Sequence, residues 1–251
     1  MKISTFIPIF TTSTALAVPT FEHTSHLDVE KFVARISEMF PGNITVSDST
    51  PGLVQSWKNL SAEFHLNIKE DAVATDRKCS DITVVFARGT TEVSNVGVLV
   101  GPPFLDALRQ RAGRWVSVAM QGVEYAANMT GYAMGGDPDG SQRMADYVEE
   151  AITACPQTKL VISGYSQGAQ LTHNAAKLLP ANVTSKISSA VTFGDPYLSE
   201  PFQGMSNATA LKFCNEGDGV CQAGATIGLQ HLVYARRVAE AADFVMSRAG
   251  Y

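Results

Sequence analysis

The feature that most constrains the fold is an apolar run that leads into a glycine–serine–glycine motif. Residues 161–163 are Val-Ile-Ser, and residues 164–168 are Gly-Tyr-Ser-Gln-Gly. Such a segment between a strand and a helix forms a sharp turn, because the small residues flanking the serine let the two elements approach closely. The turn exposes the serine hydroxyl at a helix N-terminus, where a backbone N–H can bind a developing oxyanion. We therefore predict that Ser166 is a nucleophile and that Gln167 contributes to an oxyanion hole.

Apolar runs and helical patterns alternate from Cys79 to the C-terminus. Strands are predicted at residues 82–87, 115–120, 159–163, 187–193 and 210–214. Helices are predicted at residues 104–112, 139–154, 167–179 and 231–248. Strands separated by helices form right-handed βαβ units, so we expect an α/β fold with a mainly parallel sheet covered on both faces.

Length, charge and the first residues bound the class of protein. A chain of 251 residues can bury one substantial core, and a net charge of -5 without any Lys/Arg cluster argues against nucleic-acid binding. Residues 1–17 have the pattern of a secretory signal peptide with a small-x-small cleavage site. No later segment reaches the length of an apolar membrane span. We therefore expect a secreted, extracellular protein without an integral membrane segment.

Four cysteines are present, and an even number in a secreted chain indicates disulfides. Three pairings are available in principle. The spacing favours a local bond between Cys214 and Cys221, which leaves Cys79 and Cys155 for a long-range bond. The alternative is a metal site built from Cys214, Cys221 and His231, although no CxxC or HxxxH spacing supports it.

Residues 18–78 differ from the rest of the chain. Ser25 and Asp28 form a start similar to a capping box. One helical face follows, formed by Val29, Phe32, Val33, Ile36 and Phe40. After a break at residues 41–52, a weaker apolar stripe consists of Trp57, Leu60 and Phe64. We interpret residues 18–78 as an N-terminal extension that is a set of packed helices, a removable pro-segment or a lid, and residues 79–251 as the catalytic domain.

A serine nucleophile needs a base, and the chain has five histidines. Three of them lie within the N-terminal extension. His173 follows Ser166 by seven residues on the same predicted helix, which is about 10 Å along the axis and too far to share a proton. His231 lies at a loop-to-helix junction after all the predicted strands, where it can fold back over the sheet edge. We predict that His231 is the base.

The carboxylate that orients the imidazole is expected on a loop after a strand. Asp218 lies between Cys214 and Cys221, so a disulfide there restricts its loop before the reaction. Asp195 also follows a predicted strand and is the main rival, but its place before a proline is typical of a turn residue. We favour Asp218, since it gives the chain order Ser, Asp, His of hydrolases with this elbow.

A second oxyanion donor is expected after the first predicted strand. Residues 87–92 are Ala-Arg-Gly-Thr-Thr-Glu. Thr90 can donate its backbone N–H and its hydroxyl, and the N–H of Gln167 completes the hole. The alternative is a strand-ending turn in which Arg88 and Glu92 form an ion pair.

Four motifs together resemble the cutinase family, which includes cutinase-like esterases and the related acetylxylan esterases. They are residues 87–92, the elbow at 164–168, the Cys-Asn-Glu-Gly-Asp-Gly-Val-Cys loop at 214–221, and the His-Leu-Val-Tyr segment at 231–234. The resemblance covers about residues 79–251. It implies an α/β-hydrolase-like three-layer sandwich with a five-stranded parallel central sheet. Many members have serine where this chain has Thr90, and residues 18–78 are longer than the pro-segments usual in fungal members.

The resemblance also implies the roles of the site residues. Ser166 would be the nucleophile, His231 the base and Asp218 the acid, with Thr90 and Gln167 as the oxyanion hole. The acyl chain would lie between Ala225, Ile227 and Leu232 on one side and residues 96–99 and 120–123 on the other. For residues 96–99 and 120–123, ordinary core packing is the alternative.

These observations predict a secreted serine esterase that acts through an acyl-enzyme and needs no metal or organic cofactor. Its substrates would be cutin-type aliphatic polyesters and short-to-medium chain soluble esters, and we expect a monomer. One alternative is an acetylxylan esterase, which would need a polar, sugar-lined cleft. Another is a secreted host-recognised protein that acts partly independently of catalysis. Glycosylation is suggested by sequons at Asn43, Asn59, Asn128, Asn182 and Asn207.

Overall fold

The computed structural model describes residues 26–45, 51–76, 79–224 and 226–251. The predicted signal peptide, Ser25 and the predicted substrate-groove residue Ala225 lie outside these ranges. Within them, no helix has both the length and the apolar character needed to cross a membrane.

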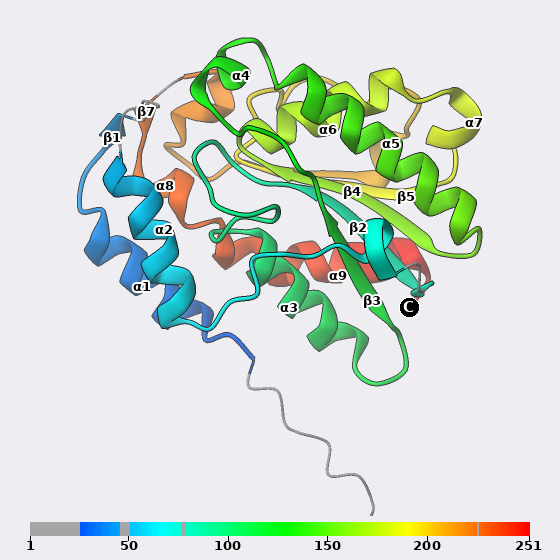
Figure 1. Ribbon diagram of the computed structural model, residues 1–251, viewed down its shortest axis with the longest axis horizontal. Helices are drawn as coiled ribbons and strands as arrows, with labels where there is room; N and C mark the ends of the chain where they lie inside the picture. Colours follow the sequence, from blue (N-terminus) through cyan, green and yellow to red (C-terminus); the bar gives the residue numbers. More distant parts are fainter. Residues whose placement is uncertain (1–25, 46–50, 77–78, 225) are drawn as a thin grey trace, which may run out of the picture.

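A five-stranded parallel sheet forms the centre of the molecule (Figure 1). Its strands are β2 (Ile82–Ala87), β3 (Val118–Gly122), β4 (Lys159–Tyr165), β5 (Ile187–Phe193) and β6 (Ala210–Phe213). They lie in the order β3-β2-β4-β5-β6. The register pairs Ala87 with Gly164 and Tyr165 with Phe193. The carboxyl ends of β2, β4 and β5 therefore lie together at one edge of the sheet.

Helices cover both faces of the sheet, which confirms the predicted three-layer sandwich (Figure 1). On one face lie α3 (Gly101–Ala112) and α9 (Val238–Ala249), and on the other lie α5 (Pro138–Ala154) and α6 (Gln167–Leu178). The shorter helices are α4 (Met129–Ala133), α7 (Ala181–Thr184) and α8 (Leu229–Leu232). The sheet thus separates two apolar clusters, one with α3 and α9 and one with α5 and α6.

The N-terminal extension packs on the α3/α9 side through its two helices and on the α5 side through the turn that follows them. It contains α1 (Val29–Met39), the short strand β1 (Ile44–Thr45), α2 (Pro51–Glu63) and a π-helical turn (Ala72–Asp76). Asp28 caps α1 by accepting from the Lys31 N–H at 3.0 Å. The predicted apolar faces join the larger core cluster through Phe32, Val33, Ile36, Trp57 and Leu60, and α2 adds Leu53. β1 pairs antiparallel with β7 (Thr226–Ile227), and so ties the extension to a loop of the catalytic domain.

Two predicted elements differ from the structure. The strand expected at 115–120 lies at 118–122, and Trp115 is 84% exposed in the preceding loop. The long helix expected at 231–248 is three pieces: α8, a 3₁₀ turn (Tyr234–Arg237) and α9. Its apolar spacing is preserved, but the chain leaves helical geometry at Val233, where φ is -108° and ψ is 26°. The apolar spacing along a segment cannot predict a break in the helix that depends on contacts with other parts of the chain.

Both predicted disulfides are present. Cys79 bonds to Cys155 and closes a span of 76 residues, and Cys214 bonds to Cys221 across 7 residues. In the chain-entropy model, the restriction that a disulfide places on the unfolded chain grows with the span that it closes.

We expect Cys79→Ser/Cys155→Ser to destabilise the protein more than Cys214→Ser/Cys221→Ser. Loop entropy predicts losses of about 4.5 and about 2.5 kcal/mol, respectively, in the free energy of unfolding. Urea denaturation of the two double variants and the wild type at one pH measures the difference. The reverse order would contradict the entropic explanation.

Candidate active site

Ser166 occupies a strained turn between β4 and α6. Its φ is +57° and its ψ is -120°, which a residue with a side chain rarely adopts. A Cβ on Gly164 would overlap the backbone carbonyl of Gly168, and a Cβ on Gly168 would overlap that of Ala87. The Ser166 N–H donates to the Phe193 carbonyl at 2.9 Å. The glycines therefore permit the close helix–strand contact that the motif predicted.

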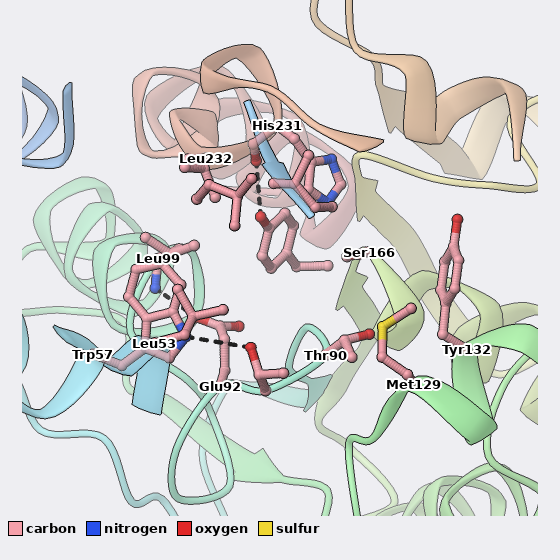
Figure 2. Close-up of a pocket in the computed structure, with 14 residues that line it drawn as sticks. Leu53, Trp57, Thr90, Glu92, Leu99, Met129, Tyr132, Ser166, His231 and Leu232 are labelled. Carbon is pink, nitrogen blue, oxygen red and sulfur yellow. Dashed lines mark hydrogen bonds between the residues drawn. The ribbon is translucent and has the colours of Figure 1, made fainter. Parts of the chain in front are cut away.

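The structure brings His231, Asp218 and Ser166 to the same sheet edge. Nδ1 of His231 lies 2.8 Å from Oδ2 of Asp218, and both side chains are buried. Nε2 of His231 is buried and has no hydrogen-bond partner within the described parts of the chain. His231 and Ser166 line the same pocket (Figure 2). The imidazole thus has one nitrogen fixed by a carboxylate and the other without a described partner, in a residue that lines the same pocket as Ser166.

Asp218 accepts hydrogen bonds from three groups. Besides His231, the Tyr234 hydroxyl donates to Oδ2 at 2.7 Å and the Val220 N–H donates to Oδ1 at 3.0 Å. Burial opposes ionisation of the carboxyl, but these bonds, chiefly that from His231, outweigh it and hold the pKa of Asp218 below its usual value. Asp218 is therefore an ionised acceptor, as a carboxylate that orients an imidazole must be.

The imidazole is also held by Tyr165. The two rings stack with centroids 5.0 Å apart, and the Tyr165 hydroxyl donates to the His231 backbone carbonyl at 2.8 Å. Tyr165 directly precedes the nucleophile, so one residue links the positions of Ser166 and His231.

Thr90 and Gln167 meet at the predicted oxyanion site. Nε2 of Gln167 donates to the Thr90 hydroxyl oxygen at 2.9 Å and to the Asn128 carbonyl at 2.7 Å. Since the Thr90 oxygen accepts this bond, its own proton is free to donate elsewhere. The backbone N–H of Gln167 is in the first turn of α6, where helix geometry supplies no internal acceptor. Both groups can therefore donate to an oxygen beside Ser166.

Glu92 holds the loop that carries Thr90. Its carboxylate accepts from the backbone N–H groups of Gly89, Val98 and Leu99, each at 2.8 Å. Burial raises the pKa of this carboxyl, and the three N–H donors oppose the shift. Arg88 does not pair with the Glu92 side chain as the alternative interpretation required. It donates instead to the backbone carbonyls of Glu92, Val123 and Tyr125.

An apolar pocket lies over the reactive side chains. Its lining includes the predicted groove residues Ile227 and Leu232, together with Leu99 from the predicted 96–99 region. Residues 120–123 do not line it: they belong to β3 and the segment directly after it, so for them the core-packing alternative is correct. Sequence reasoning missed eight lining residues, namely Ile44, Leu53, Trp57, Thr91, Glu92, Met129, Tyr132 and Tyr165. Of these, only Trp57 belonged to the predicted apolar stripe, and Thr91, Glu92 and Tyr165 stood in the motifs at 87–92 and 164–168 without an assigned role.

The rival candidates Asp195, Cys214 and Cys221 do not line this pocket. Asp195 accepts from His173 Nε2 at 3.0 Å, so these two form a separate buried pair. The sulfurs of Cys214 and Cys221 are bonded to each other, which contradicts their use as metal ligands. Groups of three or more metal-ligating side chains are likewise absent from the described residues.

Tyr234 is a site residue to which the sequence analysis assigned no role. Besides donating to Asp218, its hydroxyl accepts from the Asn215 N–H at 2.9 Å, and its side chain is fully buried. Burial and the neighbouring Asp218 raise the pKa of the phenol, so it remains a donor. Tyr234 belongs to the His-Leu-Val-Tyr segment at 231–234, three residues after the predicted base. That position was the only sign in the sequence of a role for it.

We expect Tyr234→Phe to lower the free energy of unfolding at neutral pH by about 1–3 kcal/mol, because Asp218 loses a donor and its pKa rises toward the usual value. Stability from a lowered carboxyl pKa is present above the unfolded-state value and lost as the pH falls through the folded-state value. The deficit of the variant therefore shrinks in acid.

Urea denaturation at neutral pH and below pH 3 measures this deficit. Tyr251→Phe, at a tyrosine that is 53% exposed, is the matched control and should match the wild type at both pH values. A Tyr234→Phe deficit that is equal at both pH values would contradict the role assigned to the carboxylate.

Comparison with known proteins agrees with this geometry. The family model "Cutinase" matches residues 78–249. A cutinase of Botryotinia fuckeliana is 56% identical over 69% of this chain and 86% of its own length.

The solved structure of Trichoderma reesei cutinase in complex with a C11Y4 phosphonate inhibitor superposes with a TM-score of 0.75 at 35% identity. It covers 89% of this chain and 99% of its own, so the similarity extends into the N-terminal extension. An acetyl xylan esterase structure shares the fold, with 22% identity over 69% of this chain and all of its own, and a TM-score of 0.54. The chain belongs to the cutinase family.

Proposed function

We propose that this protein is a secreted serine esterase that hydrolyses aliphatic carboxylic esters through an acyl-enzyme. The observation that carries the proposal is the chain of contacts from Asp218 through His231 into the pocket that exposes Ser166. Membership of the cutinase family, whose members hydrolyse carboxylic esters, supports the same reaction class.

In the acylation step, the Ser166 oxygen attacks the ester carbonyl carbon while its proton passes to Nε2 of His231. Asp218 stabilises the imidazolium that forms, since its carboxylate accepts from Nδ1. The carbonyl oxygen becomes an oxyanion and accepts from the Thr90 hydroxyl and the Gln167 N–H. Collapse of this intermediate breaks the bond to the alcohol, which leaves with the proton from His231.

In the deacylation step, water repeats the sequence. His231 takes a proton from a water molecule as its oxygen attacks the acyl carbon, and the same donors bind the second oxyanion. The intermediate expels the Ser166 oxygen, which recovers its proton from His231, and the carboxylic acid departs. Each oxyanion donor of this kind typically contributes about 2.7–4 kcal/mol to transition-state stabilisation.

The pocket lining favours an alkyl acyl chain. Leu53, Trp57, Leu99, Ile227 and Leu232 surround the space next to Ser166. We infer that cutin-type polyesters and soluble esters of medium chain length are substrates, and that acetylated xylan fits this lining less well, because sugar hydroxyls would lie against apolar side chains.

We expect Ser166→Ala to abolish hydrolysis of p-nitrophenyl butyrate, since the attacking oxygen is gone. Ser163→Ala is the matched control: it removes a buried serine hydroxyl on β4, the strand that leads into Ser166. This hydroxyl has no hydrogen-bond partner in the described structure, and the variant should retain wild-type kcat. Initial rates of the wild type and the two variants test the assignment. In the wild type, p-nitrophenyl butyrate should be hydrolysed at least about tenfold faster than p-nitrophenyl acetate. Full activity of Ser166→Ala would refute the assignment.

The N-terminal extension is proposed to act as a lid. Ile44, Leu53 and Trp57 come from residues outside the predicted catalytic domain, yet they line the same pocket as Ser166 and His231 (Figure 2). Trp57 is 2% exposed, and its indole N–H lies 3.5 Å from the Thr91 hydroxyl oxygen, at the limit of a hydrogen bond. Removing these side chains would open the pocket to solvent. A removable pro-segment is less compatible with the six buried apolar side chains that the extension adds to the larger core cluster.

Tryptophan fluorescence tests the lid. The chain has two tryptophans, so Trp115→Phe leaves Trp57 as the single one, at the pocket. We expect the Trp57 emission of this variant to shift to longer wavelength when an insoluble ester or a detergent opens the lid, together with a rise in esterase rate. Trp57→Phe, which leaves the exposed Trp115, is the control and should show no such shift. An unchanged Trp57 emission during hydrolysis of the insoluble ester would contradict the lid.

Secretion is proposed on the signal-peptide pattern of residues 1–17 and on the two disulfides, which persist in oxidising compartments. The five sequons fit the same route, and we propose that the secreted protein is a glycosylated monomer.

A further inference from the structure

A second buried histidine–aspartate pair lies close to the candidate active site. Nε2 of His173 lies 3.0 Å from Oδ2 of Asp195, and both side chains are fully buried. The Thr192 hydroxyl donates to the same oxygen at 2.7 Å, and the Tyr197 N–H donates to Oδ1 at 2.8 Å. The His173 ring stacks on Phe202, with 3.9 Å between centroids. The mechanism described above uses neither member of this pair.

Asp195 holds a turn that contacts both reactive residues. The carbonyl of Phe193 accepts the Ser166 N–H at 2.9 Å. Gly194 has a φ of +55°, and a Cβ added to it would lie 2.6 Å from Cε1 and 2.8 Å from Nδ1 of the His231 ring. The backbone of residues 193–194 therefore lies against the nucleophile on one side and the imidazole on the other.

His173 connects this turn to the helix that begins after Ser166. Within the described chain, three donors reach the Asp195 carboxylate, and two of them, from Thr192 and Tyr197, belong to the strand end and the turn themselves. The third comes from α6, two turns along from the nucleophile. The His173–Asp195 bond is thus the one of the three that fixes the turn relative to another element.

The groups around Asp195 and His173 indicate where the proton of their hydrogen bond lies. Burial opposes ionisation of Asp195, but its three donors, chiefly His173, outweigh it and hold the pKa of the carboxyl below its usual value. Nδ1 of His173 is buried and has no hydrogen-bond partner among the described residues. A proton there would be an unsatisfied buried donor, so the ring carries its proton on Nε2 and donates it to Asp195.

We propose that His173 and Asp195 are positioning residues for ester hydrolysis, whose hydrogen bond fixes the turn at residues 193–195 where it supports Ser166 and His231. The inference rests on the proposed function. Loss of the bond lets the turn shift relative to α6 and misaligns the reacting atoms, which lowers kcat. KM stays nearly constant, because the apolar lining of the pocket comes from other segments.

The test compares His173→Gln with His173→Asn. Both replacements are neutral amides, but glutamine places its amide nitrogen near the position of Nε2, and asparagine places it near that of Nδ1. With p-nitrophenyl butyrate well below the unfolding temperature, we expect His173→Asn to lower kcat about tenfold with KM within about twofold. His173→Gln restores the donor to Asp195 and should keep kcat within about threefold of the wild type.

Leu171→Ala is the matched control for lost stability. Leu171 lies on the same helix and is buried in the cluster on the α5/α6 side, away from the turn. We expect it to lower the melting temperature and leave kcat unchanged. A His173→Asn kcat within about twofold of the wild type, or equal losses in the asparagine and glutamine variants, would overturn the proposal.

Imidazole ¹⁵N spectra of the wild-type protein provide a readout that does not depend on variants folding. They should show a proton on Nε2 of His173, and a tautomer protonated on Nδ1 alone, which has no proton to donate to Asp195, would overturn the proposal. If His173→Asn does not fold, His173→Gln decides: a kcat below one tenth of the wild type refutes the role of the donor. Failure of the proposed function would look different from failure of this inference. In that case the wild-type protein would lack esterase activity, or Ser166→Ala would retain it.

Discussion

The close contact between the start of α6 and the ends of β2 and β4 is the constraint on which the site depends. It exists because Gly164 and Gly168 have no Cβ to meet the neighbouring backbone. The contact forces Ser166 into a positive φ and places the Gln167 side chain within 2.9 Å of the Thr90 hydroxyl. The strain of the turn is balanced by the Phe193 carbonyl, which accepts the Ser166 N–H.

Three buried carboxylates fix the loops around this contact. Glu92 is satisfied by three backbone N–H groups, whereas Asp195 and Asp218 each accept from one histidine, one hydroxyl and one backbone N–H. Loss of one donor to a buried carboxylate would lower the free energy of unfolding. Each carboxylate therefore holds the loop segments that donate to it in place. Burial dominates at Glu92 and raises its pKa, while the side-chain donors lower the pKa of the two aspartates.

The N-terminal extension contacts both the pocket and the loop between Asp218 and His231. Its helices complete the α3/α9 side of the core, and Leu53 and Trp57 cover the reactive end. Its strand β1 pairs with β7, which lies in the loop between Asp218 and His231. In the proposed lid, movement of the extension would therefore expose the pocket and also release the strand that lies between Asp218 and His231 in the chain.

The amino-acid sequence alone predicted the α/β class, the elbow at Ser166 and both disulfides, and it singled out Asp218 and His231, which the structure places in hydrogen-bond contact. These follow from local patterns: apolar period, glycine spacing, and polar residues placed after strands. Tertiary structure decided the rest. It broke the predicted 231–248 helix at Val233. It also formed two hydrogen bonds between residues of different elements, from Tyr234 to Asp218 and from His173 to Asp195. The same holds for the covering of the pocket by α2, whose apolar stripe showed that it packs but not what it packs against. Local periodicity reports which side of an element is buried, whereas the partner of a buried group depends on distances that only the packed chain defines.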